Sequence, residues 1–566
     1  MNNLRSLVAL LARRAEEQAD ERAYVFVSDR GTEEAAFTFR QLRDCASALA
    51  ARLAAVARPG DRAILVFPPG LEFLAAFFGC LMAGIIAVPM MMPRRNSARD
   101  ASAAILANCA PAVALTNSAF ALRGDLQTRF AHENIRWIEV DLGPTTIAPV
   151  ALPDPATDDI AFLQYTSGST SEPKGVMVSH ANLLANLEMI RIALGNTRRS
   201  TYVNWVPLYH DMGLILNALQ TLYVGATCVL MAPNAFMQRP LGWLRAISHY
   251  RAEVACSPNF GFDLCVSRYR ADQMEDVDLS SLRIALNGAE PVHAETIERF
   301  IATFASHGFD PRAMYPAYGM AEATLLISGG TRSCGHVARR VSQAALQAHR
   351  AEATSEADDT QIVVGCGRAL ARERIAIVDP QKRTRLPPDR IGEIWVSGAN
   401  IARAYWRNNA ATREVLNAEI AGERGAWLRT GDLGFLDAND ELFVTGRIKD
   451  LIIIRGMNHY PQDIERTVQS LDEDLRENCG AAFSVPDESG EETLVIVQEV
   501  ERTARHKIDS DEIKGRIREA VADCHELSAR HITLIRPGAL PKTTSGKIQR
   551  TLARKLWLDA AFDEIG

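Results

Sequence analysis

A loop rich in hydroxyl groups follows a short apolar run at residues 160–163, and this run predicts a buried strand. The loop contains Thr166, Ser167, Gly168, Ser169, Thr170 and Ser171, and Lys174 follows it. Hydroxyl groups, backbone N–H groups at a glycine bend and a single ammonium group are what a phosphate chain binds. A loop of this composition without the preceding strand is usually plain surface. Its position after a buried strand therefore favours a phosphate-binding loop.

The loop differs from a Walker A motif, which places Gly before Lys and Ser or Thr after it. Here Lys174 precedes Gly175, and no other stretch of the chain fits the Walker pattern. We expect Gly175 to lead into a second strand at 176–178. Ser179 then has the side chain and the position of a helix N-cap.

Two further stretches carry groups that can react with or hold a substrate. Residues 202–214 predict an aromatic-rich strand that brings His210 and Asp211 to a helix start, although Asp211 could equally be a simple N-cap. In the stretch 314–324, the ring of Tyr318 can stack on a flat base. Glu322 offers a hard oxygen ligand for Mg²⁺, and the plain alternative is a carboxylate at a helix start.

The C-terminal third adds another carboxylate and two cations. Asp432 lies on a Gly-flanked turn, where its carboxylate can accept hydrogen bonds from both hydroxyl groups of a ribose. Arg447 can help to hold ribose or phosphate. A Gly/Ser loop at 540–547 presents Lys547, and taken alone it is only a basic loop. Eight of the 62 basic residues are lysines, and Lys174 and Lys547 are among the few that fall in such motifs, where a compact ammonium group suits the chemistry.

The composition limits which functions are possible. The chain has 566 residues and a net charge of −7, which argues against nucleic acid as the main partner. Its ten cysteines contain no Cys-x-x-Cys pair, and we expect reduced thiols in a cytoplasmic protein. The stretch 73–92 is uncharged, but Gly84 and Pro89 interrupt it, so it predicts a buried helix at 71–82 and a core strand at 85–88 instead of a membrane span.

Helix-like and strand-like segments alternate through residues 1–160. This alternation predicts an α/β fold with parallel sheets covered by helices. Residues 37–42 predict a short strand, and Thr38 is a candidate N-cap.

The loop at 165–175 resembles the phosphate loop of the adenylate-forming superfamily, which includes acyl-CoA synthetases, adenylation domains and luciferases. Ser171 stands where that family usually has Gly. Six motifs in all follow the family's order and spacing, so the resemblance covers nearly the whole chain. It implies a large N-terminal domain of helix-covered β-sheets at 1–448 and a small mobile α/β domain at 449–566, with Lys449 as the hinge.

The resemblance also implies a role for each matching residue. Lys547 would bridge the carboxylate and the α-phosphate, His210 would border the reacting carboxylate, and Glu322 would hold Mg²⁺. The residues implied to hold ATP are Thr166, Ser167, Gly168, Ser169, Thr170, Lys174, Gly288, Ala289, Glu290, Tyr318, Gly319, Met320, Thr324, Asp432 and Arg447. The residues implied to line the acyl pocket are Trp205, Met212, Asn259 and Phe260.

Four features resemble the fatty acyl-AMP ligases in particular: Ala321 before Glu322, the Cys366-Gly367-Arg368 stretch, the Pro258-Asn259-Phe260 stretch and a polar insertion at 332–361. We expect a helix at 341–350 of this insertion. The resemblance implies that a fatty acid and ATP give an acyl-adenylate and pyrophosphate. The acyl group would then pass to the phosphopantetheine thiol of a separate acyl carrier protein, because no carrier domain follows Gly566.

Two alternatives stay open. A medium- or long-chain fatty acyl-CoA ligase would differ only in its thiol acceptor. A non-enzymatic nucleotide-binding scaffold is disfavoured because both Glu322 and Lys547 are present.

Overall fold

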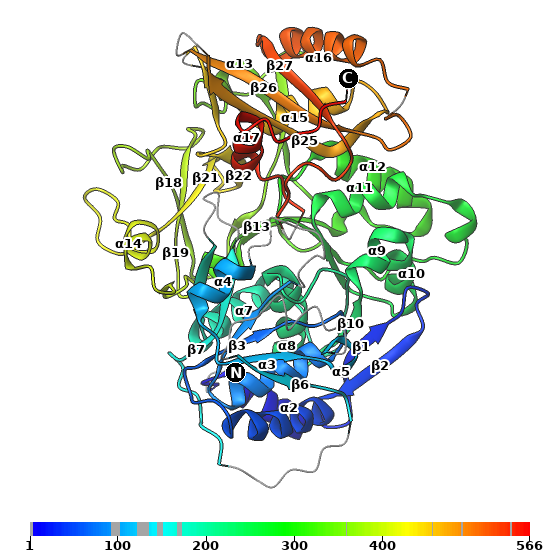
Figure 1. Ribbon diagram of the computed structural model, residues 1–566, viewed down its shortest axis with the longest axis vertical. Helices are drawn as coiled ribbons and strands as arrows, with labels where there is room; N and C mark the ends of the chain where they lie inside the picture. The colour runs from blue at the N-terminus through cyan, green and yellow to red at the C-terminus, as the bar shows by residue number, and fades with distance from the viewer. Residues whose placement is uncertain are drawn as a thin grey trace.

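Two large sheets form the main body of the protein (Figure 1). The computed structural model describes residues 4–91, 102–121, 135–143, 151–166, 173–357, 359–455, 457–487, 491–505, 507–543 and 546–565. Within these residues, nine strands form one sheet in the order β17 (Arg368–Ala369), β14 (Leu326–Gly329), β13 (Met314–Gly319), β12 (Ile284–Asn287), β11 (Val254–Ser257), β9 (Thr201–Asn204), β10 (Thr227–Met231), β1 (Arg22–Val27) and β2 (Glu33–Thr38). The other described sheet of this kind has seven strands in the order β20 (Ala404–Tyr405), β8 (Lys174–Ser179), β7 (Ile160–Thr166), β4 (Ile86–Pro89), β3 (Arg62–Leu65), β5 (Val113–Thr116) and β6 (Arg136–Glu139).

The central strands of both sheets are parallel, and antiparallel strands lie at the edges. Parallel neighbours need long crossovers, and helices supply them while covering the sheets. The described helical segments of this part are α1 (Leu7–Glu17), α2 (Phe39–Ala54), α3 (Glu72–Met82), α4 (Ser102–Cys109), α5 (Ser118–Ala121), α7 (His180–Leu194), η1 (Met212–Leu219), α8 (Gln220–Val224), α9 (Pro233–Gln238), α10 (Leu241–His249), α11 (Asn259–Ser267), η2 (Ala271–Gln273), α12 (Ala294–Phe304), η3 (Ala305–His307), η4 (Pro311–Ala313) and η5 (Ala321–Ala323). The predicted α/β class is confirmed.

The rest of the chain adds smaller layers. A four-stranded sheet consists of β18 (Arg374–Val378), β19 (Gly392–Ser397), β21 (Leu428–Leu436) and β22 (Leu442–Arg447). The helical segments α14 (Asn409–Ala411) and η6 (Thr412–Leu416) lie between β20 of the seven-stranded sheet and β21. The C-terminal segment contains β23 (Ile452–Ile454), β24 (Met457–His459), α15 (Pro461–Gln469), β25 (Leu475–Pro486), β26 (Glu492–Val500), α16 (Ser510–His525), β27 (Ala529–Ile535) and α17 (Arg550–Leu558). In Figure 1 this segment, coloured orange to red, sits over one end of the larger body.

Two capping predictions are confirmed. The Thr38 hydroxyl accepts a hydrogen bond from the Gln41 backbone N–H, and Gln41 reciprocates in a capping box at the start of α2. Ser179 caps α7 in the same way with Asn182. The predicted strand at 37–42 is wrong beyond Thr38, because this capping box starts a helix at Phe39.

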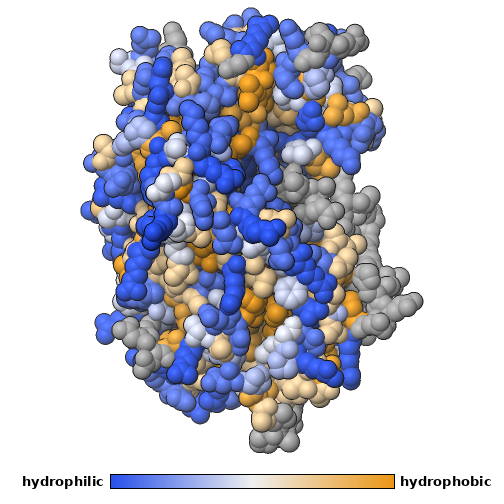
Figure 2. Space-filling model, turned by 90° about the vertical axis from the view of Figure 1, so that its left-hand side faces the viewer, coloured by the Kyte–Doolittle hydropathy of each residue, from blue (hydrophilic) through white to orange (hydrophobic). Residues whose placement is uncertain are grey.

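The uncharged stretch folds as a buried helix and a core strand, as predicted. Ten of the eleven residues of α3 are buried, and β4 lies inside the seven-stranded sheet. None of the helices in the described part of the chain is long and apolar enough to cross a membrane. On the face drawn in Figure 2, hydrophilic residues predominate and hydrophobic residues gather in small patches.

The insertion differs from its prediction. The expected helix at 341–350 is a strand, β15 (Ala338–Ser342), followed by a short helix, α13 (Gln343–Gln347). β15 pairs with β16 (Thr360–Val364), and this pairing places Val341 in a buried cluster with Phe435, Phe443 and Tyr460. Pairing with β16 and burial in this cluster outweigh local helix propensity here.

The C-terminal segment has hydrophobic clusters of its own. Ile464, Ile496, Ile517 and Leu534 belong to one of them, on the helix-covered face of β25–β27. The cluster around Tyr460 joins this segment to the insertion and to β21–β22. The segment therefore has hydrophobic clusters of its own and also shares one with the rest of the chain.

Candidate active site

A cavity of about 1720 Å³ lies between the larger body and the C-terminal segment. Among the residues predicted from the sequence, its lining includes Thr166, Lys174, His210, Met212, Asn259, Gly288, Ala289, Glu290, Tyr318, Gly319, Met320, Glu322, Asp432, Arg447, Lys449 and Lys547. Trp205, Phe260 and Thr324 are not among the lining residues. The predictions for Ser167, Gly168, Ser169 and Thr170 lie outside the described residues.

Asp432 organises the predicted ribose corner. Its Oδ2 accepts a hydrogen bond from the Tyr318 hydroxyl at 2.8 Å, and its Oδ1 accepts one from Arg447 Nε at 2.8 Å. Asp432 and Arg447 face each other across the β21–β22 pair, so the ion pair is set by strand register. The Asp432 carboxylate raises the pKa of Arg447, and burial raises that of Tyr318. The corner combines a flat ring with a fixed carboxylate and a cation.

Glu322 lies on a strained turn that directs its side chain into the cavity. Thr324, two residues after Glu322 in the same turn, has φ 66° and ψ −58°, a backbone conformation that a β-branched residue rarely adopts. The Thr324 hydroxyl donates to the Asn400 carbonyl at 2.5 Å, which accounts for its absence from the lining. Tyr405 donates its hydroxyl hydrogen to Glu322 Oε1 at 2.8 Å. Burial raises the pKa of Glu322.

Lys547 enters the cavity from the C-terminal segment. The Thr543 N–H donates to the Lys547 carbonyl at 2.7 Å, and the Lys547 N–H donates to the Thr543 hydroxyl at 3.0 Å, so Thr543 holds the backbone of Lys547. Burial lowers the pKa of the Lys547 ammonium group, and the nearby guanidinium of Arg447 adds to this shift. The carboxylates of Asp211, Asp432 and Glu290 oppose it. The ammonium group therefore lies where residues from four separate motifs converge.

His210 and Asp211 form a pair at the start of η1. His210 Nδ1 lies 2.6 Å from Asp211 Oδ1, and the Met212 N–H donates to Asp211 Oδ1 at 2.7 Å. Burial raises the pKa of Asp211, but His210, the Met212 N–H and Lys547 hold it below its usual value overall. Asp211 thus caps the helix, as the plain interpretation predicts, and its carboxylate also contacts the imidazole of His210.

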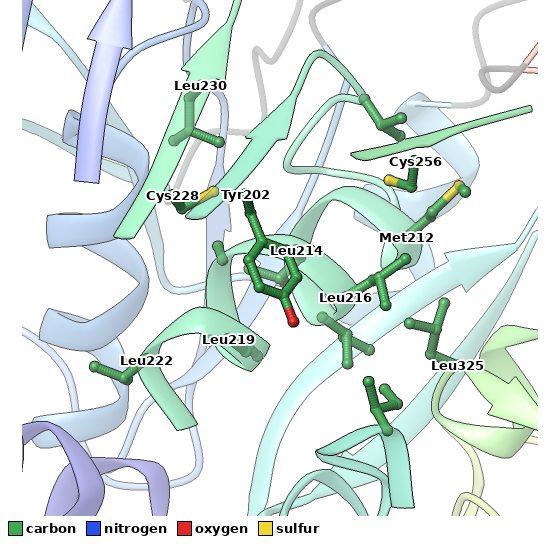
Figure 3. Packing of buried hydrophobic residues seen from close by; sticks show 14 of the residues in the cluster. Tyr202, Met212, Leu214, Leu216, Leu219, Leu222, Cys228, Leu230, Cys256 and Leu325 are labelled. Carbon is green, nitrogen blue, oxygen red and sulfur yellow. The ribbon is translucent and has the colours of Figure 1, made fainter. Parts of the chain in front are cut away.

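The apolar side of the cavity lies beside η1, which has π-helical geometry. Met212 and Leu216 from η1 and Leu325, before β14, line the cavity, and Figure 3 shows them on one side of the buried cluster. Trp205 lies deeper, with its ring stacked on Phe236 at 3.9 Å between centroids. Leu216 and Leu325 were missed from the sequence because apolar residues carry no local signal for a pocket.

The segment with Gly288, Ala289 and Glu290, which the resemblance assigns to ATP, is tied to α11. Glu290 Oε1 accepts a hydrogen bond from the Phe260 N–H at 2.6 Å, and Asn259 Oδ1 accepts one from the His293 N–H at 3.2 Å. Burial raises the pKa of Glu290 to about 7. Phe260 therefore supports the wall of the cavity through the hydrogen bond of its backbone N–H to Glu290.

Comparison with known proteins adds to this geometry. The model of the AMP-binding enzyme family matches residues 11–406, and the model of the Disco-interacting protein 2-like AMP domain matches residues 449–565. The chain belongs to the AMP-binding enzyme family. This family lies within the adenylate-forming superfamily, so the resemblance seen in the sequence is confirmed.

Individual relatives group this adenylate-forming enzyme with the fatty acyl-AMP ligases. It is 44% identical to the medium-chain-fatty-acid–[acyl-carrier-protein] ligase JamA of Moorena producens, over 99% of this chain and 96% of JamA. It is 36% identical to the ligase TtuA of Teredinibacter turnerae, which has the same activity name, over 97% of this chain and 93% of TtuA. A fatty acid AMP ligase structure from Legionella pneumophila is 39% identical with a TM-score of 0.75, covering 100% of this chain and 98% of that one.

Proposed function

We propose that this enzyme is a fatty acyl-AMP ligase that serves an acyl carrier protein. It converts a fatty acid and ATP to acyl-AMP and pyrophosphate, and then transfers the acyl group to the phosphopantetheine thiol of a separate carrier protein. The observation that carries the proposal is the convergence of Lys547, Asp432 and Glu322 on a cavity with an apolar side. The names of the two ligases, JamA and TtuA, favour a medium-chain acid and a carrier acceptor.

The adenylation step brings together two anions. A carboxylate oxygen attacks the α-phosphorus, a new P–O bond forms, and the bond to pyrophosphate breaks. Fixed cations must offset the repulsion in the transition state. In this proposal Lys547 would offset charge at the reacting atoms and Lys174 at the departing phosphates, while His210 would border the carboxylate. Asp432 and Arg447 hold the ribose end.

The groups around Glu322 suit Mg²⁺. Glu322 Oε1 accepts the hydrogen bond of the Tyr405 hydroxyl, and among the described residues no side chain donates to Glu322 Oε2. The described part of the chain has no group of three or more His, Cys, Asp or Glu side chains that could hold a metal ion by themselves. A site with one protein carboxylate suits Mg²⁺, which takes its remaining ligands from phosphates and water. When bound, the ion would neutralise charge on the phosphates.

We place the boundary between the N-terminal domain and the mobile C-terminal domain at residues 448 and 449. The second family match begins at Lys449, and the segment beyond it has its own hydrophobic clusters, which supports this boundary. Rotation about Lys449 would withdraw Lys547 after adenylation and admit the pantetheine arm, a conformational step of the kind that many enzymes use.

The purified protein should be incubated with ATP, Mg²⁺ and fatty acids of increasing length, with CoA or with a phosphopantetheinylated carrier protein, and the products identified by mass. We expect acyl-AMP that persists in the presence of CoA and disappears when the carrier is added. Rapid formation of acyl-CoA would show a CoA ligase instead. No adenylate with any acid would overturn the proposal.

A further inference from the structure

Tyr405 lies at the edge of the seven-stranded sheet and was not predicted from the sequence. It is 3% exposed, and its side chain lines the cavity between Glu322 and Lys174. In the proposed function, Glu322 holds the metal ion and Lys174 binds the departing phosphates. Its hydroxyl and its ring each contact one of them.

The hydroxyl holds Glu322. It donates to Oε1 at 2.8 Å, a distance typical of a hydrogen bond to a carboxylate. The same segment holds the Glu322 backbone, since the Ala402 N–H donates to the Glu322 carbonyl at 2.8 Å. Asn400 holds the turn that follows, through its contacts with Ala323 and Thr324.

The ring holds Lys174. The Lys174 Nζ lies 5.1 Å from the centroid of the Tyr405 ring, within the range of a cation–π interaction. The backbone is fixed as well, because Tyr405 pairs with Val176 across β20 and β8. The Trp406 N–H donates to the Gly175 carbonyl at 2.7 Å. The pairing of β20 with β8 thus fixes the position of Tyr405 relative to Lys174.

We propose that Tyr405 is a positioning residue that sets the separation and orientation of Glu322 and Lys174, and so prepares the site for the phosphates and metal ion of a metal–nucleotide complex. The inference rests on the proposed function and deepens it. Tyr405 does not react. It keeps a carboxylate and an ammonium group of opposite charge apart, so that each stays available to the incoming ligand.

Tyr315 provides a matched control. It is also a buried tyrosine, on β13, but its hydroxyl has no hydrogen-bond partner in the described structure and it does not line the cavity. Removing the hydroxyl in Tyr315→Phe therefore tests the loss of a buried phenol oxygen alone. Tyr405→Phe removes a hydroxyl that holds Glu322.

The test uses the full-length chain and Mn²⁺ with adenosine 5′-(α,β-methylene)triphosphate, whose methylene bridge replaces the oxygen of the bond that normally breaks, so that no AMP is transferred. Binding is measured by electron paramagnetic resonance. We expect Tyr405→Phe to weaken binding of the Mn²⁺–nucleotide complex about tenfold, in line with losses of partners that orient metal ligands. Tyr315→Phe should bind as the unchanged protein does. In adenylation assays, Tyr405→Phe should raise KM for Mg·ATP and leave KM for the fatty acid unchanged.

The role of the ring is tested separately with Tyr405→Leu, which should weaken binding further than Tyr405→Phe because it also frees Lys174. The inference is overturned if Tyr405→Phe binds Mn²⁺–nucleotide like the unchanged protein, or if it and Tyr315→Phe lose binding equally. Failure of the proposed function is a different result. In that case no fatty acid is adenylated by the unchanged protein, while the nucleotide-binding difference between the variants can still be measured.

Discussion

Single side chains from distant motifs meet at Lys547. The ammonium group faces carboxylates from three places, namely Asp211 before η1, Glu290 after β12 and Asp432 on β21. Each carboxylate favours the charged form of Lys547 while the cavity holds no anionic substrate. A substrate carboxylate and an α-phosphate would take over this role during adenylation.

Replacing Lys547 by Ala should lower the rate of acyl-AMP formation about 10²–10³-fold, because a donor aimed at developing charge is lost. Pyrophosphate release measures the rate. Lys507→Ala is the control, since Lys507 is an exposed lysine of the same segment that does not line the cavity. Unchanged adenylation by Lys547→Ala would instead favour the nucleotide-binding scaffold.

At the scale of elements, the insertion joins the larger body to the C-terminal segment. Gln343 Nε2 donates to the Cys524 carbonyl at 3.1 Å, and Gln361 Nε2 donates to Asp463 Oδ2 at 2.8 Å. Val341 of the same insertion is fully buried in a shared cluster. Deleting residues 335–360 would therefore open a hydrophobic cluster as well as remove the hydrogen bond of Gln343.

The double variant Gln343→Ala/Gln361→Ala removes the polar contacts and keeps the cluster. Two hydrogen bonds contribute about 2 kcal/mol, so other domain arrangements should become up to about thirtyfold more populated. If the insertion restricts the acceptor, acyl-CoA should appear among the products while acyl-AMP formation persists. Gln381→Ala, in an exposed turn before β19, is the control. A product profile identical to that of the unchanged protein would mean that these contacts do not restrict CoA.

Histidine burial at the end of α16 predicts a pH dependence of stability. His525 Nδ1 lies 3.4 Å from Gln343 Nε2, and its Nε2 lies 2.8 Å from the Thr467 hydroxyl. Burial, with a smaller effect of His459, lowers the pKa of His525 from 6.5 to about 4. Between these values the unfolded chain binds the proton more readily, so stability should fall as pH decreases from about 6.5 to 4.

His525→Gln should lose less stability on acidification than the unchanged protein. The difference should reach about 2 kcal/mol at pH 5, from the shift in pKa. Urea unfolding at pH 7.5 and pH 5 measures it, and His531→Gln, at an exposed histidine on β27, is the control. An equal loss in His525→Gln and in the unchanged protein would contradict the assignment.

At the scale of the whole molecule, α15 holds the C-terminal segment against the larger body. Arg466 Nη2 donates to His293 Nδ1 at 2.8 Å, and His293 directly precedes α12, three residues after Glu290. Burial, and then the Arg466 cation, lower the pKa of His293 to about 3, so the ring accepts this bond in its neutral form. The bond links the nucleotide-side wall of the cavity to the segment that carries Lys547.

Arg466→Ala should slow acyl-AMP formation by up to about tenfold, because a hydrogen bond from a charged donor contributes about 1.5 kcal/mol to the arrangement that places Lys547. Transfer of a preformed acyl-AMP to the thiol should be affected less. A double-mutant cycle with His293→Ala isolates the pair, and Arg518→Ala on the exposed face of α16 is the control. Additive effects of the two substitutions would show that the pair is not coupled.

The amino-acid sequence by itself determined the features that depend on neighbours along the chain. The capping boxes at Thr38 and Ser179, the buried helix α3 and the α/β alternation all follow from local side-chain chemistry and periodicity. The family motifs are equally local, and most of the predicted site residues that the structure describes do line the cavity.

Only the tertiary structure decided what depends on pairing between distant segments. Tyr405 meets Glu322 across 83 residues, and Arg466 meets His293 across 173. The insertion forms the strand β15 because this segment pairs with β16 and packs into a buried cluster. Local propensity does not indicate either contact. A hydrogen bond or a packed cluster depends on geometry in space, and the order of residues along the chain does not specify that geometry locally.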